Sequence, residues 1–298
     1  MEQSIHADLK YCHAADGQRL GYRAHPSGRT GAPALVMLHG LASNGTRFSE
    51  FCANTCLRGS WDLYQPDLRG HGASMTRARF SREVWCRDQL SLLDAQQHPE
   101  AVFMGHSLGA QVAMELAVAH PDRVRGLILI DPVFPEALGG AMAWARRLAG
   151  LWRPVIPLLR LPGRLFIQGK GFPYRDLHAL DEQTRALLGQ SDDHQLVRLY
   201  MNPHEDLHFL PLSNYLQDLS ELMRPVPDMS RLAMPVLVLR STGARLTDQD
   251  ITLSRLKCLP NVRCVDIAAD HWLLTERPKE ARIAIEQWCM GLMEDPST

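Results

Sequence analysis

The sequence predicts an α/β protein: a mostly parallel, doubly wound sheet with a helical cap insertion. Short apolar runs bounded by turns recur along the chain, as expected of buried parallel strands. Helical patterns lie between these runs, which is typical of helices covering both faces of a parallel sheet. The alternation stops over residues 134–228. We therefore expect residues 1–133 and 229–298 to form the core, and residues 134–228 to form a helical cap, or lid.

The elements of this core can be placed in order. Two strand-like runs flank Asp16-Gly17, a strong signal for a hairpin turn. Helical patterns cover Arg82–Gln97 and Leu108–His120. Buried parallel strands are expected at Ala34–Leu38, Trp61–Tyr64, Ala101–Met104, Gly126–Ile130 and Val236–Leu239.

Composition and charge indicate an ordinary globular protein and bear on its possible partners. The 298 residues carry a formal net charge of -1 and are 45% hydrophobic, which is ordinary for a globular protein. This balance argues against nucleic acid or an anionic membrane as the main partner. We find neither a secretory signal pattern nor an apolar run of about 18 residues, so we expect a cytoplasmic protein without a membrane span. The seven scattered cysteines lack disulfide-framework or zinc spacing. The oligomeric state stays open.

The segment Gly105-His106-Ser107-Leu108-Gly109 matches the pattern G-x-S-x-G. It directly follows a strand run and directly precedes a helix, which is the context that gives the pattern meaning. Glycines beside the serine allow a sharp turn with close backbone approach. The helix amino terminus offers N–H groups and a favourable field for developing negative charge. The alternative is a glycine-rich turn with an incidental serine. We predict that Ser107 is a nucleophile.

Together with this turn, two further segments carry a family resemblance. His39-Gly40-Leu41 closes the first core strand, and Asp67–Ser74 follows the next strand. Here the chain resembles the α/β-hydrolase family, in particular its serine esterases and lipases with a cap domain, over about residues 30–133 and 233–290.

The resemblance implies an oxyanion hole formed by the backbone N–H groups of Leu41 and Leu108. We expect His39 to hold in place the loop that supplies the Leu41 N–H. We interpret His71 and Asp67 as structural residues that hold their loop by hydrogen bonds.

Thirteen histidines compete for the role of general base. His271 lies after the apolar run Val262–Ile267 and before the last helical pattern, in a segment that resembles the final strand, loop and helix of the family. The order along the chain also fits, because the histidine comes last in this fold. The alternative is an exposed loop histidine beside Trp272. We predict that His271 is the base.

The acid departs from the family pattern, because Ala244 stands at its usual place after the penultimate strand. A catalytic triad of serine, histidine and an acid needs a buried carboxylate that accepts a hydrogen bond from the imidazole Nδ1–H. Asp131 ends the strand run before the insertion and is our prediction, although an aspartate there can also brace the turn before Pro132. Asp248 is the rival, and its alternative role is to cap a helix.

A second motif, His204-Glu205-Asp206-Leu207-His208, fits the zinc-protease pattern H-E-x-x-H. A zinc site would also need a third ligand and both histidines on one helical face. Pro203 and Pro211 leave room for barely two helical turns. We therefore expect a solvated polar helix, and neither a metal nor a cofactor.

These residues predict a serine hydrolase that cleaves a carboxylic ester through an acyl-enzyme intermediate. Thioesterase, lactonase and C–C bond hydrolase activities use the same machinery and stay open. A hypothesis of another class is a catalytically weak ligand-binding protein on the same scaffold, suggested by Ala244. The expected partner is a small, partly apolar acyl substrate. Apolar cap residues either line a chamber for it or pack the cap: Trp144, Trp152, Leu158, Phe166 and Phe172.

Overall fold

The computed structural model describes residues 8–165, 171–188, 200, 202–243 and 246–294. Within these residues one eight-stranded sheet has the strand order β1-β2-β4-β3-β5-β6-β7-β8. The pairs β1–β2 and β2–β4 are antiparallel, and the remaining pairs are parallel. The strands are β1 (Leu9–His13), β2 (Arg19–His25), β3 (Ala34–Leu38), β4 (Asp62–Pro66), β5 (Ala101–His106), β6 (Val124–Ile130), β7 (Val236–Ser241) and β8 (Val262–Ile267). The predicted fold class is confirmed.

Side chains of each central strand alternate between the two faces of the sheet. In β3, Val36 and Leu38 enter one apolar cluster, whereas Leu35 and Met37 enter the other. Both faces are therefore dry, which explains why the strand runs are continuously apolar rather than alternating. The hairpin turn lies at Gly17, whose φ of 81° suits glycine.

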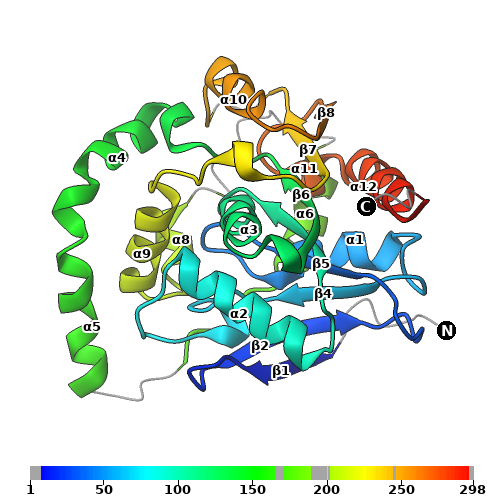
Figure 1. Ribbon diagram of the computed structural model, residues 1–298. Helices are drawn as coiled ribbons and strands as arrows, with labels where there is room; N and C mark the ends of the chain where they lie inside the picture. The colour runs from blue at the N-terminus through cyan, green and yellow to red at the C-terminus, as the bar shows by residue number, and fades with distance from the viewer. Residues whose placement is uncertain (1–7, 166–170, 189–199, 201, 244–245, 295–298) are drawn as a thin grey trace.

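Helices cover both faces of the sheet, as Figure 1 shows. The first cluster receives side chains from α2 (Arg82–Ala95), α3 (Leu108–Ala119) and α10 (Gln249–Leu256). The second cluster receives side chains from α1 (Ser49–Asn54), α11 (Leu273–Glu276) and α12 (Pro278–Glu294). This two-sided covering is the doubly wound arrangement that the sequence predicts.

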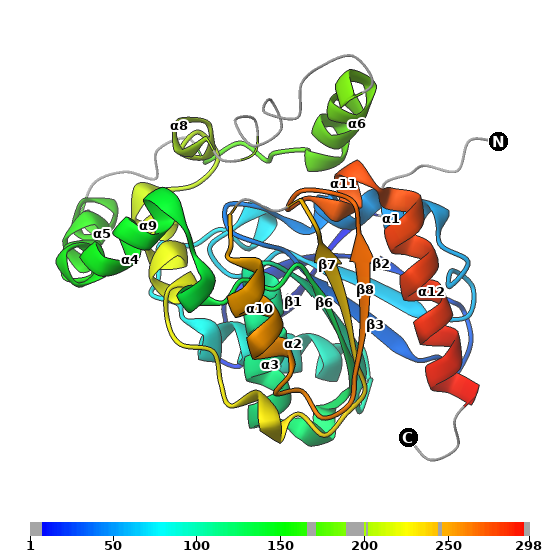
Figure 2. The same ribbon diagram turned by 90° about the horizontal axis from the view of Figure 1, so that it is seen from above.

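Between β6 and β7 the chain leaves the sheet and forms further helices. These are α4 (Gly140–Trp152), α5 (Val155–Leu165), α6 (Leu177–Leu188), α8 (Pro203–Asp206) and α9 (Leu212–Leu222). Figure 2 shows them gathered outside the sheet and its covering helices. Helix α5 packs on α9, and α6 packs on α11. None of the helices in the described part of the chain is both long and apolar enough to cross a bilayer.

Candidate active site

Ser107 lies on the sharp turn between β5 and α3. Its backbone adopts φ 55° and ψ −113°, a conformation that a side chain disfavours and that clusters at functional sites. The Ser107 N–H donates to the Ile130 carbonyl at 3.0 Å and so ties the turn to β6. A Cβ atom at Gly105 or Gly109 would come within 2.3 or 2.1 Å of backbone oxygens. The two glycines are therefore required for the turn to close.

His271 and Asp131 form a buried hydrogen-bonded pair. His271 follows β8, and its Nδ1 lies 2.6 Å from Oδ2 of Asp131, at the end of β6. This is a charge-assisted contact of the geometry that fixes an imidazole tautomer. The residues predicted as base and acid are thus brought together. Among the described residues no hydrogen bond joins Ser107 to His271, although both line one cavity; such bonds often tighten only when substrate is bound.

Ser241 holds the second oxygen of Asp131, a role that the sequence alone does not predict. Asp131 Oδ1 accepts from the Ser241 N–H at 3.0 Å and from its Oγ at 2.7 Å. Asp131 itself has a φ of 42°, so its backbone is strained at the strand end. The pairing of Ile130 with Leu239 places the ends of β6 and β7 side by side. No motif in the sequence marks Ser241, because its place opposite Asp131 depends on the register of β6 and β7.

Asp248, the rival acid, caps α10. Its carboxylate accepts from the N–H groups of Asp250 and Ile251, each at 3.0 Å, which is the bonding of an N-cap residue. Helix capping is the alternative role that the sequence indicates for Asp248. Ala244, at the usual place of the acid, lies outside the described residues.

The loop after β3 lies against the serine. A side chain at Gly40 would reach within 3.4 Å of Ser107 Cβ, and Leu41 and Ser107 line the same cavity. His39 Nδ1–H donates to the Gly40 carbonyl at 2.9 Å, while its Nε2 accepts from the Leu68 N–H at 2.9 Å. Burial holds the pKa of His39 well below its usual value, so a neutral ring makes both bonds. Leu108 starts α3 beneath Ser107.

His106 positions the loop that carries His271. Its Nε2 donates to the His271 backbone carbonyl at 2.9 Å. Burial and the nearby His271 ring lower the pKa of His106 to about 3, so the ring is neutral near pH 7.

Asp67 and His71 make the loop contacts expected of structural residues. Asp67 accepts from the N–H groups of Gly45 at 2.8 Å and Ala73 at 2.7 Å. His71 Nε2 bonds Asp218 of α9 at 2.7 Å, and both side chains are buried. Burial opposes a charge on His71, but the Asp218 carboxylate outweighs it and raises the His71 pKa. This pair ties α9 to the core.

A cavity of about 290 Å³ lies over Ser107 and His271, between the loops after the strands and the inserted helices. Its charged residues are paired: Arg175 bonds Asp206 at 2.8 Å, and Arg47 bonds Asp181. Burial raises the pKa of Asp206 to about 6. The larger apolar side chains of the lining include Leu41, Met142, Leu177, Tyr215, Leu219, Leu222, Leu246 and Trp272.

Two of the apolar residues expected either to line a chamber or to pack the cap face solvent instead. Trp144 is 65% exposed and Leu158 is 61% exposed. Trp152 hydrogen-bonds Ser220 of α9 and packs against the first core cluster. Phe166 lies outside the described residues. The expectation was wrong for Trp144 and Leu158, because helical spacing shows that apolar residues share a face but not where that face points.

The residues of the H-E-x-x-H pattern lie close together on the surface. Ligand atoms of His204, Glu205 and His208 lie within 4.8 Å of one another, and all three side chains are exposed. Helix α8 ends at Asp206, and the two histidine rings stack edge to face with centroids 5.2 Å apart. The sequence predicts a solvated polar helix here, and the three side chains are exposed.

The strand order and the strained serine turn are those of an α/β-hydrolase. The family model described as "Serine aminopeptidase, S33" (Hydrolase_4) matches residues 31–267. The chain therefore belongs to this family of α/β-hydrolases.

Individual proteins resemble the chain at low sequence identity. The chain is 30% identical over 147 residues to Lipase LipV of Mycobacterium tuberculosis (strain ATCC 25618 / H37Rv), covering 44% of this chain and 55% of that protein. The chain thus spans only about half the length of this relative. It is 25% identical over 278 residues to the magnesium-chelatase 30 kDa subunit of Rhodobacter capsulatus, covering 90% and 92%. A solved hydrolase from Pseudomonas aeruginosa PA01 superposes with a TM-score of 0.68 at 20% identity, covering 95% and 98%.

Proposed function

We propose that this hydrolase is a serine esterase that cleaves a carboxylic ester through an acyl-enzyme intermediate. The observation that carries the proposal is the 2.6 Å contact between His271 Nδ1 and Asp131 Oδ2, in a cavity that Ser107 also lines. A histidine with its Nδ1 proton held by a carboxylate keeps Nε2 free to act as a base.

In the proposed mechanism His271 Nε2 takes the proton of Ser107 Oγ as that oxygen attacks the ester carbonyl. The imidazolium that forms is stabilised by Asp131. The N–H groups of Leu41 and Leu108 hold the oxyanion of the tetrahedral intermediate. The intermediate collapses, and His271 gives its proton to the departing alcohol. Water, activated by the same histidine, then attacks the acyl-serine and releases the carboxylic acid.

We propose that residues 134–228 act as the cap over this cavity, because α4, α6 and α9 supply part of its lining. About 290 Å³ is near the lower end of ligand pockets, which favours a small or medium substrate. Arg47 and Arg175 are each paired with an aspartate, so the cavity offers no uncompensated cation for an anionic substrate. The apolar lining suits a neutral, partly apolar acyl group. Thioesters, lactones and activated C–C bonds fit the same machinery.

A catalytically weak ligand-binding protein is the alternative of another class. The relative that matches along 90% of the chain is named as a magnesium-chelatase subunit, not as a hydrolase. Against this alternative stand the strained backbone of Ser107 and the buried His271–Asp131 pair. Both features are costly to keep in a protein that only binds.

The test is hydrolysis of a panel of p-nitrophenyl esters from acetyl to octanoyl by the full chain. We expect turnover with a preference for the shorter acyl groups, and background rates in Ser107→Ala. Asp248→Asn is the matched control, since asparagine caps a helix as well as aspartate does. Absence of turnover across esters, thioesters and lactones would contradict the proposal.

A further inference from the structure

Helix α4 and the first turns of α5 form an arm, residues 140–160, along the outer side of the molecule (Figure 1). Large apolar side chains on it face solvent, and they recur every three or four residues, so they lie on one face. We call them the apolar stripe: Trp144 (65% exposed), Leu148 (46%), Leu151 (70%), Val155 (40%) and Leu158 (61%). A helix on the surface of a protein normally turns such a face inward.

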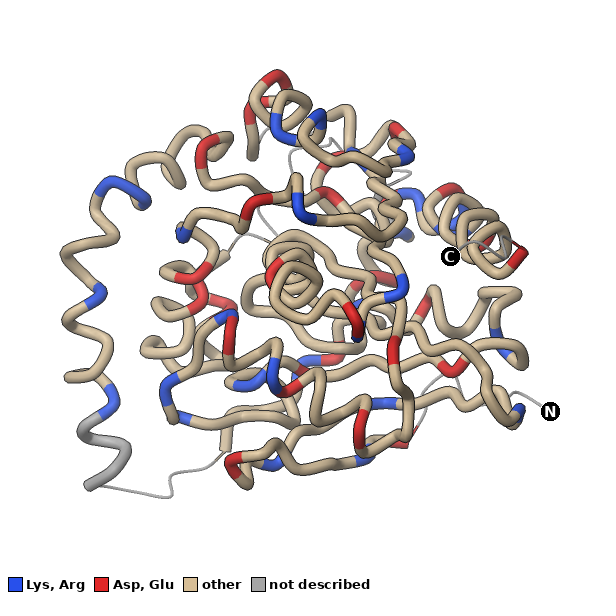
Figure 3. The backbone as a smooth tube through the Cα atoms, in the orientation of Figure 1, with Lys and Arg blue, Asp and Glu red and all other residues tan. Residues whose placement is uncertain are grey.

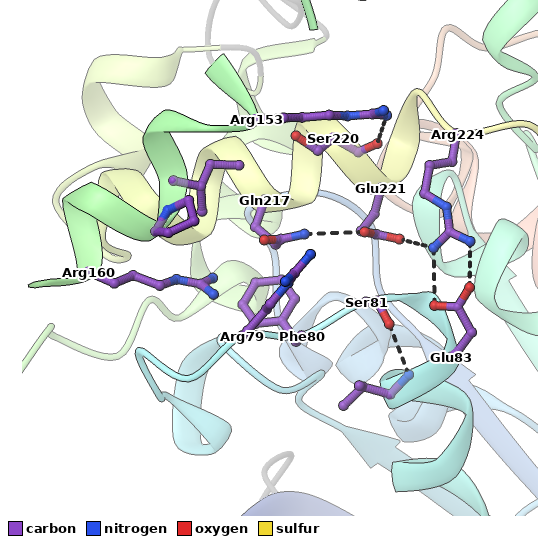
Figure 4. A pocket seen from close by; sticks show the side chains of 13 residues that line it. Arg79, Phe80, Ser81, Glu83, Arg153, Arg160, Gln217, Ser220, Glu221 and Arg224 are labelled. Atoms are coloured by element: carbon purple, nitrogen blue, oxygen red, sulfur yellow. Dashed lines mark hydrogen bonds and ion pairs between the residues drawn. The ribbon is translucent and has the colours of Figure 1, made fainter. Parts of the chain in front are cut away.

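The opposite face of the arm is fixed by polar and cation–π contacts with the body of the protein. Trp152 Nε1 donates to Ser220 Oγ at 3.1 Å, and Arg153 donates to the Ser220 carbonyl at 3.3 Å. The Arg160 guanidinium lies over the Phe80 ring, 5.5 Å from its centroid. Figure 4 shows Arg153 and Arg160 on one wall of a cavity of about 570 Å³, facing α9 and the start of α2. Turning the stripe inward would break these contacts.

The charged residues of the arm itself are all cationic. Residues 140–160 contain four arginines and no acidic residue, whereas the whole chain has a net charge of -1. Figure 3 shows the charged positions of the arm in blue. Arg147 flanks the stripe and lies over the Trp144 ring, 5.4 Å from its centroid. A helix is about 10 Å across. An anionic surface in contact with the stripe would therefore lie within roughly one Debye length of the arginines on the far side of the helix and would still attract them.

We propose that the arm docks on an anionic phospholipid surface. The apolar stripe enters the boundary between headgroups and acyl chains, Arg147 lies beside the stripe at the level of the headgroups, and the other arginines of the arm attract the anionic surface from the far side of the helix. An exposed apolar face with tryptophan, on a segment whose own charged residues are all cationic, is the pattern of an interfacial helix. A second copy of the chain is disfavoured as the occupant, because two arms of the same positive charge would repel each other.

Docking would also place the catalytic cavity near the lipid. Ala141 and Met142, at the start of α4, line that cavity. The proposal does not depend on ester hydrolysis, since its test measures binding and not turnover.

The test is co-sedimentation of the full chain with vesicles of phosphatidylcholine alone or mixed with phosphatidylglycerol. We expect binding to the mixed vesicles that weakens as salt is raised. The variants Leu151→Glu and Leu158→Glu should each weaken this binding by about tenfold or more, because each places a carboxylate against anionic lipid. Ile283→Glu is the matched control: this residue is 41% exposed on α12, and binding should not change.

A second readout uses the tryptophan of the stripe. Mixed vesicles should shift the fluorescence emission of the unmodified protein to shorter wavelength, and Trp144→Phe should remove most of that shift. Failure of the unmodified protein to bind mixed vesicles would overturn the proposal, as would equal loss in Ile283→Glu. Self-association that Leu151→Glu abolishes, without vesicle binding, would assign the stripe to a second copy and overturn it too.

Discussion

Replacing Asp131 by asparagine tests the assignment of the acid, because the two carboxylate oxygens have different partners. Oδ1 accepts two hydrogen bonds from Ser241, and Oδ2 faces His271 Nδ1 at 2.6 Å. The Ser241 N–H can only donate, so the amide oxygen of the introduced asparagine should stay with it. The amide NH₂ then faces His271 Nδ1 and turns that nitrogen into an acceptor. The ring proton moves to Nε2, the atom that must act as the base.

We expect kcat of Asp131→Asn to fall by about 10⁴, which is roughly 5.5 kcal/mol of lost transition-state stabilisation. The fold should be retained, because the donors of Ser241 keep an acceptor. The assay is steady-state hydrolysis of the best ester in the panel, with thermal unfolding as the check on folding. A kcat within tenfold of the unmodified protein would refute the reasoning. A comparable loss in Asp248→Asn, which should keep the cap of α10, would move the acid to that residue.

Three further outcomes are expected. Ser241→Ala keeps the backbone donor to Asp131 but loses the buried Oγ donor, so kcat should fall about tenfold and the free energy of unfolding should fall by about 1–3 kcal/mol. Asp218→Asn removes the carboxylate that raises the pKa of buried His71. Stability from that pair is full below the unfolded-state histidine pKa of about 6.5 and is lost as pH rises through the raised folded-state value. Urea unfolding of this variant should therefore show its largest deficit at low pH. Gly109→Ala would place a Cβ atom 2.1 Å from a backbone oxygen of β3, and should cost about 1–3 kcal/mol in denaturant unfolding.

Local sequence patterns are enough to predict the candidate nucleophile and the candidate base. The G-x-S-x-G segment lies between a strand and a helix, so the neighbouring residues alone predict that Ser107 is a nucleophile. His271 is predicted as the base from its order after the last strand run. The contact of His271 with Asp131 spans 140 residues, yet both lie at strand ends that a parallel sheet brings to one edge.

Features that depend on strand register or helix orientation were not predictable. The bonds from Ser241 to Asp131 follow from the alignment of β6 with β7, which no single run of residues encodes. The direction of the apolar stripe is another example. The spacing of Trp144, Leu151 and Leu158 predicts a shared face, but packing of the arm on α9 turns that face outward.

The central claim is that Ser107 is a nucleophile activated by the histidine that Asp131 orients. A fluorophosphonate probe tests it most directly, because the probe reacts covalently with activated serines. We predict one adduct per chain, mapped by peptide mass spectrometry to Ser107, lost in Ser107→Ala and strongly slowed in Asp131→Asn. Absence of labelling in the folded, unmodified protein, or labelling that persists in Ser107→Ala, would contradict the account.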